Sequence, residues 1–333
     1  MKPSLPSVTV RSLLRVRSDA LSLGLEVLAG AGGMDRLITS PYVLKTGQAL
    51  AGIDAYLQAG RVQVFGASEI GYLAGQAPVL RAETLARTLR HDIPCVLVTD
   101  GLPPPAEFLV EAERAGVPLL RTVLATPIAI ARLTGFLEDV LAERTMLHAV
   151  LIDVLGLGVL IVGERGIGKS ECALDLVLRG HCLVVDDTVE IRRWVESVLI
   201  GACPDLTRCH MEIRGLGIIN VRDLFGVASI RSSKRVELVV QLERWEAGRE
   251  YERLGLDDQY FEILGLRVPM NRMPVAPGRS MANLVEVAAR NQLLRARGHH
   301  AARQLADRLE QELQNQALPP VGEPEDAGEG ENE

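Results

Sequence analysis

Short apolar runs alternate with helical patterns over the first half of the chain. The runs at 8–10, 61–66 and 95–100 have the length and composition of buried strands, and we predict strands there. Residues 107–115 follow a proline-rich turn with helical spacing, and 117–120 form a further apolar run. The order strand, helix, strand predicts an α/β architecture for this half.

A longer helix is predicted over residues 127–141. Its apolar side chains recur every three or four residues, at Ile130, Leu133, Leu137 and Val140. This spacing gives the helix one buried face. A second α/β pattern begins after Arg144, so we expect an N-terminal α/β domain over residues 1–144. It lacks a phosphate loop, a metal-ligand spacing and a nucleophile motif, which favours a binding or assembly role.

The second domain is predicted over residues 145–317 and ends in two helices, 282–297 and 301–314, separated at Gly298. The last helix carries leucines at four-residue spacing, namely Leu305, Leu309 and Leu313. Such a stripe is typical of a core or of a contact between subunits. Residues 318–333 are predicted to be a disordered acidic tail.

The strongest motif is a phosphate-binding loop with the pattern G-x-x-x-x-G-K-S. It consists of Gly163, Glu164, Arg165, Gly166, Ile167, Gly168, Lys169 and Ser170. An apolar run precedes it and a helical pattern follows it, as this motif requires. Its glycines let backbone N–H groups turn toward a polyphosphate, Lys169 reaches the β- and γ-phosphates, and the Ser170 hydroxyl binds Mg²⁺. We therefore predict that the chain binds a polyphosphate with Mg²⁺.

Two adjacent carboxylates, Asp186 and Asp187, end the next apolar run. We interpret them as a strand end at the same site. Side chains alternate along a strand, so one carboxylate would lie near the metal while the other faces an incoming hydroxyl. A strand that simply ends in a turn is the alternative interpretation.

Composition and charge restrict the class of protein. Hydrophobic residues make up 47% and charged residues 24% of the 333 residues, which is typical of a globular protein. The longest uncharged apolar stretch is half the length of a membrane-spanning helix, and the N-terminus lacks the apolar core of a signal peptide, so we expect a cytoplasmic protein without a membrane partner. The formal net charge of −7 comes mostly from the acidic tail, so the charge gives no reason to expect a nucleic-acid partner.

The five cysteines are an odd number without a zinc-binding spacing, and we expect reduced thiols.

Beyond these motifs, the chain resembles the HPr kinase/phosphorylase family over nearly its whole length. The similarity rests on RTMLHAVLIDVLGLGVLI with His148, GERGIGKS, RGHCLVVDD, EIRGLGIIN with Glu212, YERLG with Arg253, and VAPGR with Arg279. In the N-terminal half it rests on VTVRSLL, MDRLITS, VTDGLPPP and RLTGFLE. The EIRGLGII string is more specific to the family than the phosphate loop. The chain departs from the family pattern at Leu155, Asn220, Ala276 and Ser280.

This resemblance implies an ATP-dependent kinase for a serine of an HPr-like phosphocarrier protein. The same site would run the reverse reaction, phosphorolysis of phosphoserine by inorganic phosphate, which releases pyrophosphate and makes pyrophosphate an alternative donor. The implied catalytic residues are His148, Lys169, Asp187, Arg253 and Arg279. Asp187 would act as base forward and as acid in reverse, and the loop 274–279 would serve the reverse direction. Ser170 and Glu212 would bind Mg²⁺, and the assembly would be a hexamer.

Without the resemblance, these residues allow other interpretations of the site and of the function. Glu212 and Arg214 could be a charge pair on the surface, His148 a core histidine, and Arg253 and Arg279 ordinary solvated or loop residues. The chain could also be a phosphate-loop kinase for a small molecule. A third possibility is a regulator without catalysis, in which ATP binding changes assembly. The H-R-D and D-F-G strings of eukaryotic protein kinases are absent from the sequence, so any kinase activity must rest on the phosphate loop.

Overall fold

The chain forms two compact units in a computed structural model. The described residues are 6–14, 23–53, 57–194, 197–204, 207–246 and 257–316. Contacts assign Met1–Arg144 and Arg192–Val198 to the first unit, and Thr145–Ile191 and Leu199–Glu333 to the second. The predicted acidic tail, residues 318–333, lies outside the described residues. Among the described residues, no helix is both long and apolar enough to cross a membrane.

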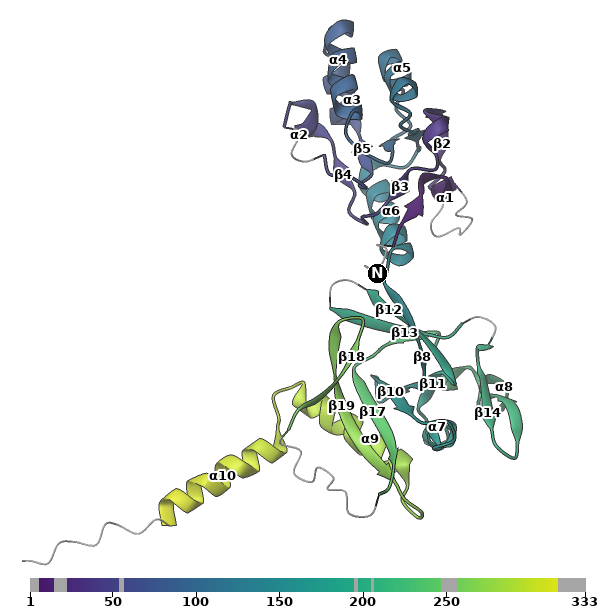
Figure 1. Ribbon diagram of the computed structural model, residues 1–333, viewed down its shortest axis with the longest axis vertical. Helices are drawn as coiled ribbons and strands as arrows, with labels where there is room; N and C mark the ends of the chain where they lie inside the picture. Colours follow the sequence, from purple (N-terminus) through teal and green to yellow (C-terminus); the bar gives the residue numbers. More distant parts are fainter. Residues whose placement is uncertain are drawn as a thin grey trace, which may run out of the picture. The chain divides into compact units, whose positions relative to one another are not determined.

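A five-stranded sheet organises the first unit (Figure 1). Its order is β2 (Glu26–Ala29), β7 (Leu119–Arg121), β6 (Val96–Val98), β5 (Gln63–Phe65) and β4 (Leu44–Lys45). The last four strands are parallel and β2 pairs antiparallel with β7. The helices are α2 (Gly47–Leu50), α3 (Ala67–Ala74), α4 (Pro78–Leu89), α5 (Ala106–Ala115) and α6 (Thr126–Val140). The expected strand, helix, strand unit is β6, α5 and β7, so the α/β prediction for this half is confirmed.

The first predicted strand of this unit is shorter than expected. Strand β1 contains only Val8–Thr9 and pairs antiparallel with β3 (Leu37–Ile38). Helix α1 (Val10–Leu14) begins at once and buries Val10 and Leu13. Those two side chains stand three positions apart, which is helical spacing, and a run of three apolar residues is too short to distinguish the two structures. The prediction of a strand through Val10 was therefore wrong.

The second unit contains a mixed six-stranded sheet. Its order is β11 (Cys182–Val185), β9 (Val150–Val154), β10 (Leu157–Gly163), β17 (Leu238–Arg244), β19 (Leu266–Val275) and β18 (Gln259–Ile263). Strands β10, β17 and β19 are parallel, and β11 and β10 both pair antiparallel with β9. The carboxyl ends of β10, β11, β17 and β19 therefore meet at one edge of the sheet, where ligands commonly bind in open α/β sheets.

Further elements surround this sheet. A four-stranded sheet has the order β16 (Ser233–Arg235), β13 (Val198–Ala202), β12 (Thr188–Trp194) and β8 (Arg144–His148). A hairpin joins β14 (His210–Ile213) to β15 (Gly217–Asn220). The helices are α7 (Lys169–Leu178), α8 (Val221–Phe225), the short 3-10 helix η4 (Val227–Ser229), α9 (Met281–Arg295) and α10 (Ala301–Gln316).

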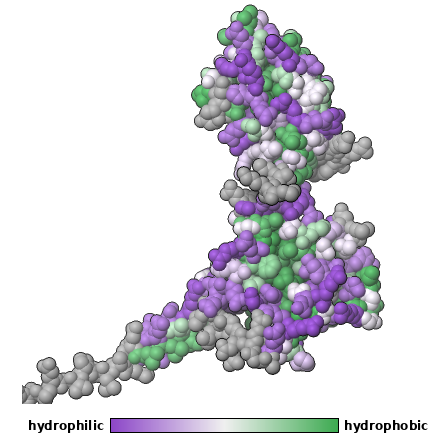
Figure 2. All heavy atoms as spheres, in the orientation of Figure 1, coloured by the Kyte–Doolittle hydropathy of each residue, from purple (hydrophilic) through white to green (hydrophobic). Residues whose placement is uncertain are grey.

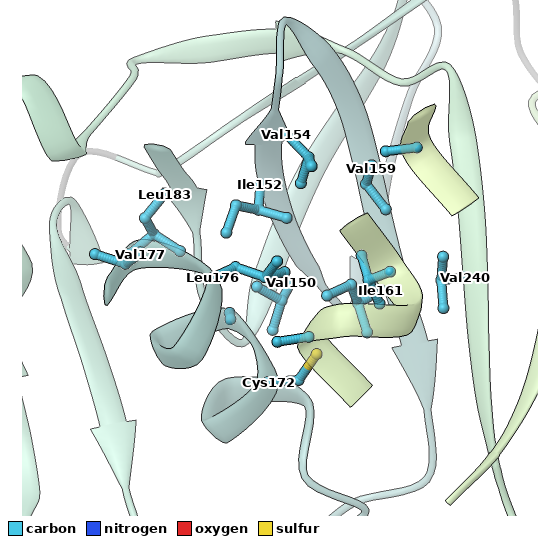
Figure 3. Close-up of a cluster of buried hydrophobic side chains, with 14 of the residues drawn as sticks. Val150, Ile152, Val154, Val159, Ile161, Cys172, Leu176, Val177, Leu183 and Val240 are labelled. Atoms are coloured by element: carbon cyan, nitrogen blue, oxygen red, sulfur yellow. The ribbon is translucent and has the colours of Figure 1, made fainter. Parts of the chain in front are cut away.

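The six-stranded sheet is buried on both faces. On one face, Val150 and Ile161 pack against α7 and α9, with Cys172 and Leu176 of α7 pointing toward the strands (Figure 3). On the other face, Leu151, Leu160 and Val239 of the six-stranded sheet pack against Val189, Ile191 and Leu199 of the four-stranded sheet. A strand covered on both sides needs apolar residues at every position. This explains the continuous apolar run that becomes β10.

The C-terminal helix α10 carries the predicted leucine stripe on its surface. Leu305, Leu309 and Leu313 are 59%, 51% and 69% exposed, and Figure 2 shows hydrophobic atoms along this helix. The stripe is therefore not part of the core formed by this single chain.

We expect Leu176→Ala to lower the free energy of unfolding by about 2–5 kcal/mol, because it removes a fully buried side chain and leaves a cavity. Leu178 of the same helix is 65% exposed, so Leu178→Ala should change the free energy by less than about 0.5 kcal/mol. Urea unfolding followed by circular dichroism measures both variants. Equal losses would contradict the packing of α7 against the sheet.

Candidate active site

The phosphate-binding loop connects the carboxyl end of β10 to the start of α7. The strand and the helix predicted on either side of the motif are both present. Gly168 is the N-cap of α7 with φ 102°. A Cβ on Gly163 would lie 2.7 Å from the carbonyl oxygen of Leu242 in the neighbouring β17. Glycine at position 163 therefore lets β10 end close to β17 and turn into the loop.

Lys169 is held by the loop that it follows. Its Nζ donates to the carbonyl oxygens of Gly163, at 2.9 Å, and Glu164, at 3.0 Å. An ammonium group has three N–H donors, so these bonds leave a third for a phosphate oxygen. Burial lowers the pKa of Lys169, while the charges of Asp186 and Asp187 act in the opposite direction. The side chain is thus oriented before any phosphate binds.

Asp186 joins three segments that are far apart in the sequence. Its Oδ1 accepts a hydrogen bond from Ser170 Oγ at 2.8 Å, and its Oδ2 accepts one from the Glu212 backbone N–H at 3.2 Å. Burial raises the pKa of Asp186, although both hydrogen bonds favour the charged form. The carboxylate therefore connects the end of β11 to the first turn of α7 and to β14.

Asp187 points away from Asp186. Its Oδ1 lies 2.9 Å from His148 Nδ1, and its side chain is 64% exposed. The two carboxylates do face different ways, but strand alternation is not the reason, because β11 already ends at Val185. Asp187 has φ 75°, a left-handed conformation that is uncommon without glycine. A turn in the chain separates the two carboxylates.

These groups line a pocket of about 340 Å³. Of the residues predicted for the site, the pocket brings together His148, Lys169, Ser170, Asp187 and Glu212, with Arg165, Gly166 and Gly168 of the loop. Glu171, Asp186 and Arg214 also line it, so the pocket presents both carboxylates and cations. Such a surface can hold a polyphosphate and a divalent cation and can exchange a proton with a bound hydroxyl.

Two pocket residues, Glu171 and Arg214, were missed by the sequence analysis. Arg214 was considered only as a surface partner of Glu212, yet its guanidinium lies against the phosphate loop, 2.6 Å from where a Cβ on Gly166 would stand. The signal was the EIRGLG string itself. Gly215 and Gly217 have φ 84° and 88°, values typical of a tight hairpin turn. Arg214 is the first residue of this turn.

Two further residues, Arg253 and Arg279, were predicted to be catalytic. Arg279 lies in the loop between β19 and α9, where its Nη1 donates to the Pro274 carbonyl oxygen at 3.4 Å, and it does not line the pocket. Arg253 lies outside the described residues. Both roles stay predictions.

Comparison with known proteins identifies the family. The family model for the HPr serine kinase C-terminal domain matches residues 139–309, and the model for the HPr serine kinase N terminus matches residues 8–137. The chain belongs to the HPr serine kinase family. The predicted family is confirmed, and with it an enzyme that uses ATP.

Relatives of this HPr serine kinase chain match it over most of its length. HPr kinase/phosphorylase of Geobacter sulfurreducens is 45% identical and covers 91% of this chain and 94% of its own. HPr kinase/phosphorylase of Caldicellulosiruptor bescii is 45% identical and covers 87% and 94%. A solved HPr(Ser) kinase/phosphatase from Coxiella burnetii is 33% identical, covers 52% of this chain and 99% of that chain, and has a TM-score of 0.43.

Two departures from the HPr serine kinase pattern have a structural explanation. Asn220 is the N-cap of α8, where its Oδ1 accepts hydrogen bonds from the N–H groups of Arg222 and Asp223 at 3.0 and 3.3 Å. Ser280 is the N-cap of α9 and accepts from the N–H of Asn283 at 3.4 Å. Asn, Asp and Ser are interchangeable at such positions. Both replacements therefore preserve a helix start.

The oxygen donors of this HPr serine kinase site suit Mg²⁺. Ser170, Asp186 and Glu212 all line the pocket, and hydroxyl and carboxylate oxygens are the ligands that Mg²⁺ prefers. Among the described residues, no three His, Cys, Asp or Glu side chains form a metal-binding group on their own.

We expect Asp186→Asn to stabilise the metal-free protein at pH 8, because burial disfavours the charged carboxylate. Because the pKa of Asp186 is raised in the folded protein, the folded state is most stable while this carboxyl is protonated. The stabilisation is complete below the ordinary aspartate pKa and is lost as pH rises through the raised pKa. Tm at pH 8 should therefore be higher in Asp186→Asn than in the wild type, and the gain should shrink toward pH 5.

Thermal unfolding in EDTA between pH 5 and pH 8 measures this difference. Asp175→Asn is the matched control, because Asp175 is an exposed residue of α7 and the substitution should leave Tm nearly unchanged. A gain that is constant with pH would show that the charge of Asp186 is not its cause.

Proposed function

We propose that the chain phosphorylates a serine of the phosphocarrier protein HPr with ATP and runs the reverse phosphorolysis on the same site. The observation that carries this proposal is the exposed carboxylate of Asp187, which lines the same pocket as the phosphate-binding loop. A folded protein can present a serine only to a base at the surface. The names of the relatives, HPr kinase/phosphorylase, support this choice of substrate.

In the forward direction, Asp187 accepts the proton of the substrate serine as its oxygen attacks the γ-phosphorus of ATP. His148, with Nδ1 at 2.9 Å from the Asp187 carboxylate, orients this base. Lys169 and the backbone N–H groups of the loop stabilise charge on the group in transfer. Ser170 and Glu212 would hold Mg²⁺, which would neutralise part of the negative charge of the phosphates.

In reverse, an oxygen of inorganic phosphate attacks the phosphorus of phosphoserine. The bond from phosphorus to the serine oxygen breaks, a new phosphorus–oxygen bond forms pyrophosphate, and protonated Asp187 gives its proton to the serine oxygen. The two directions pass through the same arrangement of groups. The loop 274–279 with Arg279 keeps its predicted role in this direction.

We assign catalysis to the domain 145–317 and binding or assembly to the domain 1–144. A homo-oligomer, a hexamer by family resemblance, is supported by the leucine stripe on α10, which a second copy of the chain would cover. None of the five cysteines forms a disulfide in the described part of the chain, which agrees with the cytoplasm as the proposed compartment.

The decisive experiment replaces the proposed base. Asp187→Asn should lower serine phosphorylation of HPr and phosphorolysis by about 10²–10⁴-fold, the usual contribution of a positioned general base, while the Kd for Mg-ATP changes by less than about threefold. Radiolabelled transfer and calorimetric titration measure the two effects. Lys169→Ala is the comparison variant that should lose nucleotide binding as well.

Normal transfer by Asp187→Asn would refute its assignment as the base. A wild-type protein that binds ATP but phosphorylates neither HPr nor any small molecule would favour a nucleotide-gated regulator, and transfer only to a small molecule would favour the other kinase class.

Glu212→Gln should raise the Mg²⁺ concentration for half-maximal activity by about tenfold, because an amide is a weaker ligand for Mg²⁺ than a carboxylate. Its Tm should change little, since Glu212 is exposed on β14. A magnesium titration of the kinase reaction at saturating ATP measures the effect. An unchanged titration would return Glu212 to the role of a surface charge.

A further inference from the structure

Glu171 is a pocket residue to which the proposed mechanism assigns no role. It lies in the first turn of α7, directly after Ser170, and its side chain is exposed. It lines the pocket together with Lys169 and Ser170. An acidic residue in the first turn stabilises a helix, but this helix start is also expected to receive a polyphosphate. A carboxylate at this position lowers the affinity for an anion unless a cation offsets its charge.

The other carboxylates of the pocket have partners or an assigned role. Asp186 accepts two hydrogen bonds, and Asp187 Oδ1 lies 2.9 Å from His148 Nδ1. Glu212 is a proposed metal ligand. Within the described part of the chain, the Glu171 carboxylate forms neither an ion pair nor a hydrogen bond. It is therefore available to a ligand that enters the pocket.

The pocket as a whole has no excess of positive charge. Among the described residues that line it, the acidic side chains are Glu171, Asp186, Asp187 and Glu212, and the permanent cations are Arg165, Lys169 and Arg214. A nucleoside triphosphate carries several negative charges at neutral pH, and like charges a few ångströms apart repel each other strongly in a partly enclosed site. The pocket therefore disfavours a nucleotide that arrives without a cation.

A magnesium ion on the phosphates reverses the effect of Glu171. Mg²⁺ bound by few protein side chains keeps several water ligands, and these waters donate hydrogen bonds. Glu171 follows the proposed ligand Ser170 in the sequence and lines the same pocket as the proposed ligand Glu212. A carboxylate without a protein partner can accept hydrogen bonds from such waters, so it favours the metal-bound nucleotide.

We propose that Glu171 makes the phosphate-binding loop selective for the magnesium complex of a nucleotide over the free nucleotide. Its charge repels phosphate groups that arrive without the metal, and its oxygens accept hydrogen bonds from the waters of a metal that arrives with them. No bond or proton is transferred at Glu171, so it is a specificity-determining residue and not a catalytic one. This inference rests on the proposed magnesium site, but not on the identity of the phosphoryl acceptor.

The test measures the Kd of the full chain for ATP by calorimetric titration, in EDTA and with saturating Mg²⁺. Glu171→Gln keeps the shape of the side chain and removes its charge. We expect it to bind ATP in EDTA about tenfold more tightly than the wild type, because one repulsive charge is lost, and to bind Mg-ATP with a Kd within about threefold of the wild-type value. Glu171→Asp retains the charge and should retain most of the preference for Mg-ATP.

Ionic strength distinguishes charge repulsion from a change in the shape of the pocket. The Debye length falls from about 30 Å at about 0.01 M to about 3 Å at about 1 M ionic strength. In EDTA, the ratio of the wild-type Kd to the Glu171→Gln Kd should therefore shrink toward about one as salt is added. A ratio that does not depend on salt would contradict the proposal.

Asp175→Asn is the matched control, because Asp175 is an exposed acidic residue one turn further along α7 and does not line the pocket. Both of its Kd values should equal those of the wild type. An unchanged Kd of Glu171→Gln in EDTA, or equal changes in EDTA and in Mg²⁺, would overturn the proposal and leave Glu171 with a role in the helix start alone.

Two further outcomes separate this inference from the proposed function. If Mg²⁺ leaves the wild-type Kd for ATP unchanged, the proposed magnesium site and the selectivity assigned to Glu171 fail together. If the Kd values follow the expected pattern and the wild-type chain does not phosphorylate HPr, the proposed function fails and the role of Glu171 is supported.

Discussion

The hydrogen bonds of one buried carboxylate hold the active site together. Asp186 is bonded to Ser170 in the first turn of α7 and to the backbone of β14, so the loop and the hairpin are positioned by the same side chain. Burial outweighs these bonds, as the raised pKa of Asp186 shows. A cation bound in the pocket would offset that cost, so the residue favours ligand binding at the expense of the stability of the empty site.

The location of the site follows from the topology of the sheet. Strands β10 and β11 run in the same direction with β9 between them, so the phosphate loop and Asp186 emerge at the same edge. The apolar residues on both faces of β10 anchor the loop between a helical layer and a second sheet. A polar loop with three positive-φ glycines can thus be held rigidly without a core of its own.

The sequence predicted the features that consecutive residues determine and missed those that depend on contacts between distant residues. The phosphate loop, its strand and its helix are specified by consecutive residues, and so is the amphipathic α6, which buries Leu133 and Leu137 as its spacing predicts. The approach of Arg214 to Gly166 joins residues far apart in the chain, and no local pattern contains it. The same holds for Arg279, whose place in the sequence says nothing about its distance from the loop.

The two neighbouring carboxylates show how one turn separates two functions. An aspartate in the left-handed region costs about 1–2 kcal/mol, and at Asp187 its surroundings maintain it, because the Asp187 carbonyl oxygen accepts from the Ala149 N–H at 3.0 Å and its carboxylate contacts His148. The turn leaves Asp186 buried among metal-ligand candidates and Asp187 exposed to an acceptor. Strain at this position therefore turns two adjacent carboxylates in different directions, as their proposed separate roles at the nucleotide and at the serine require.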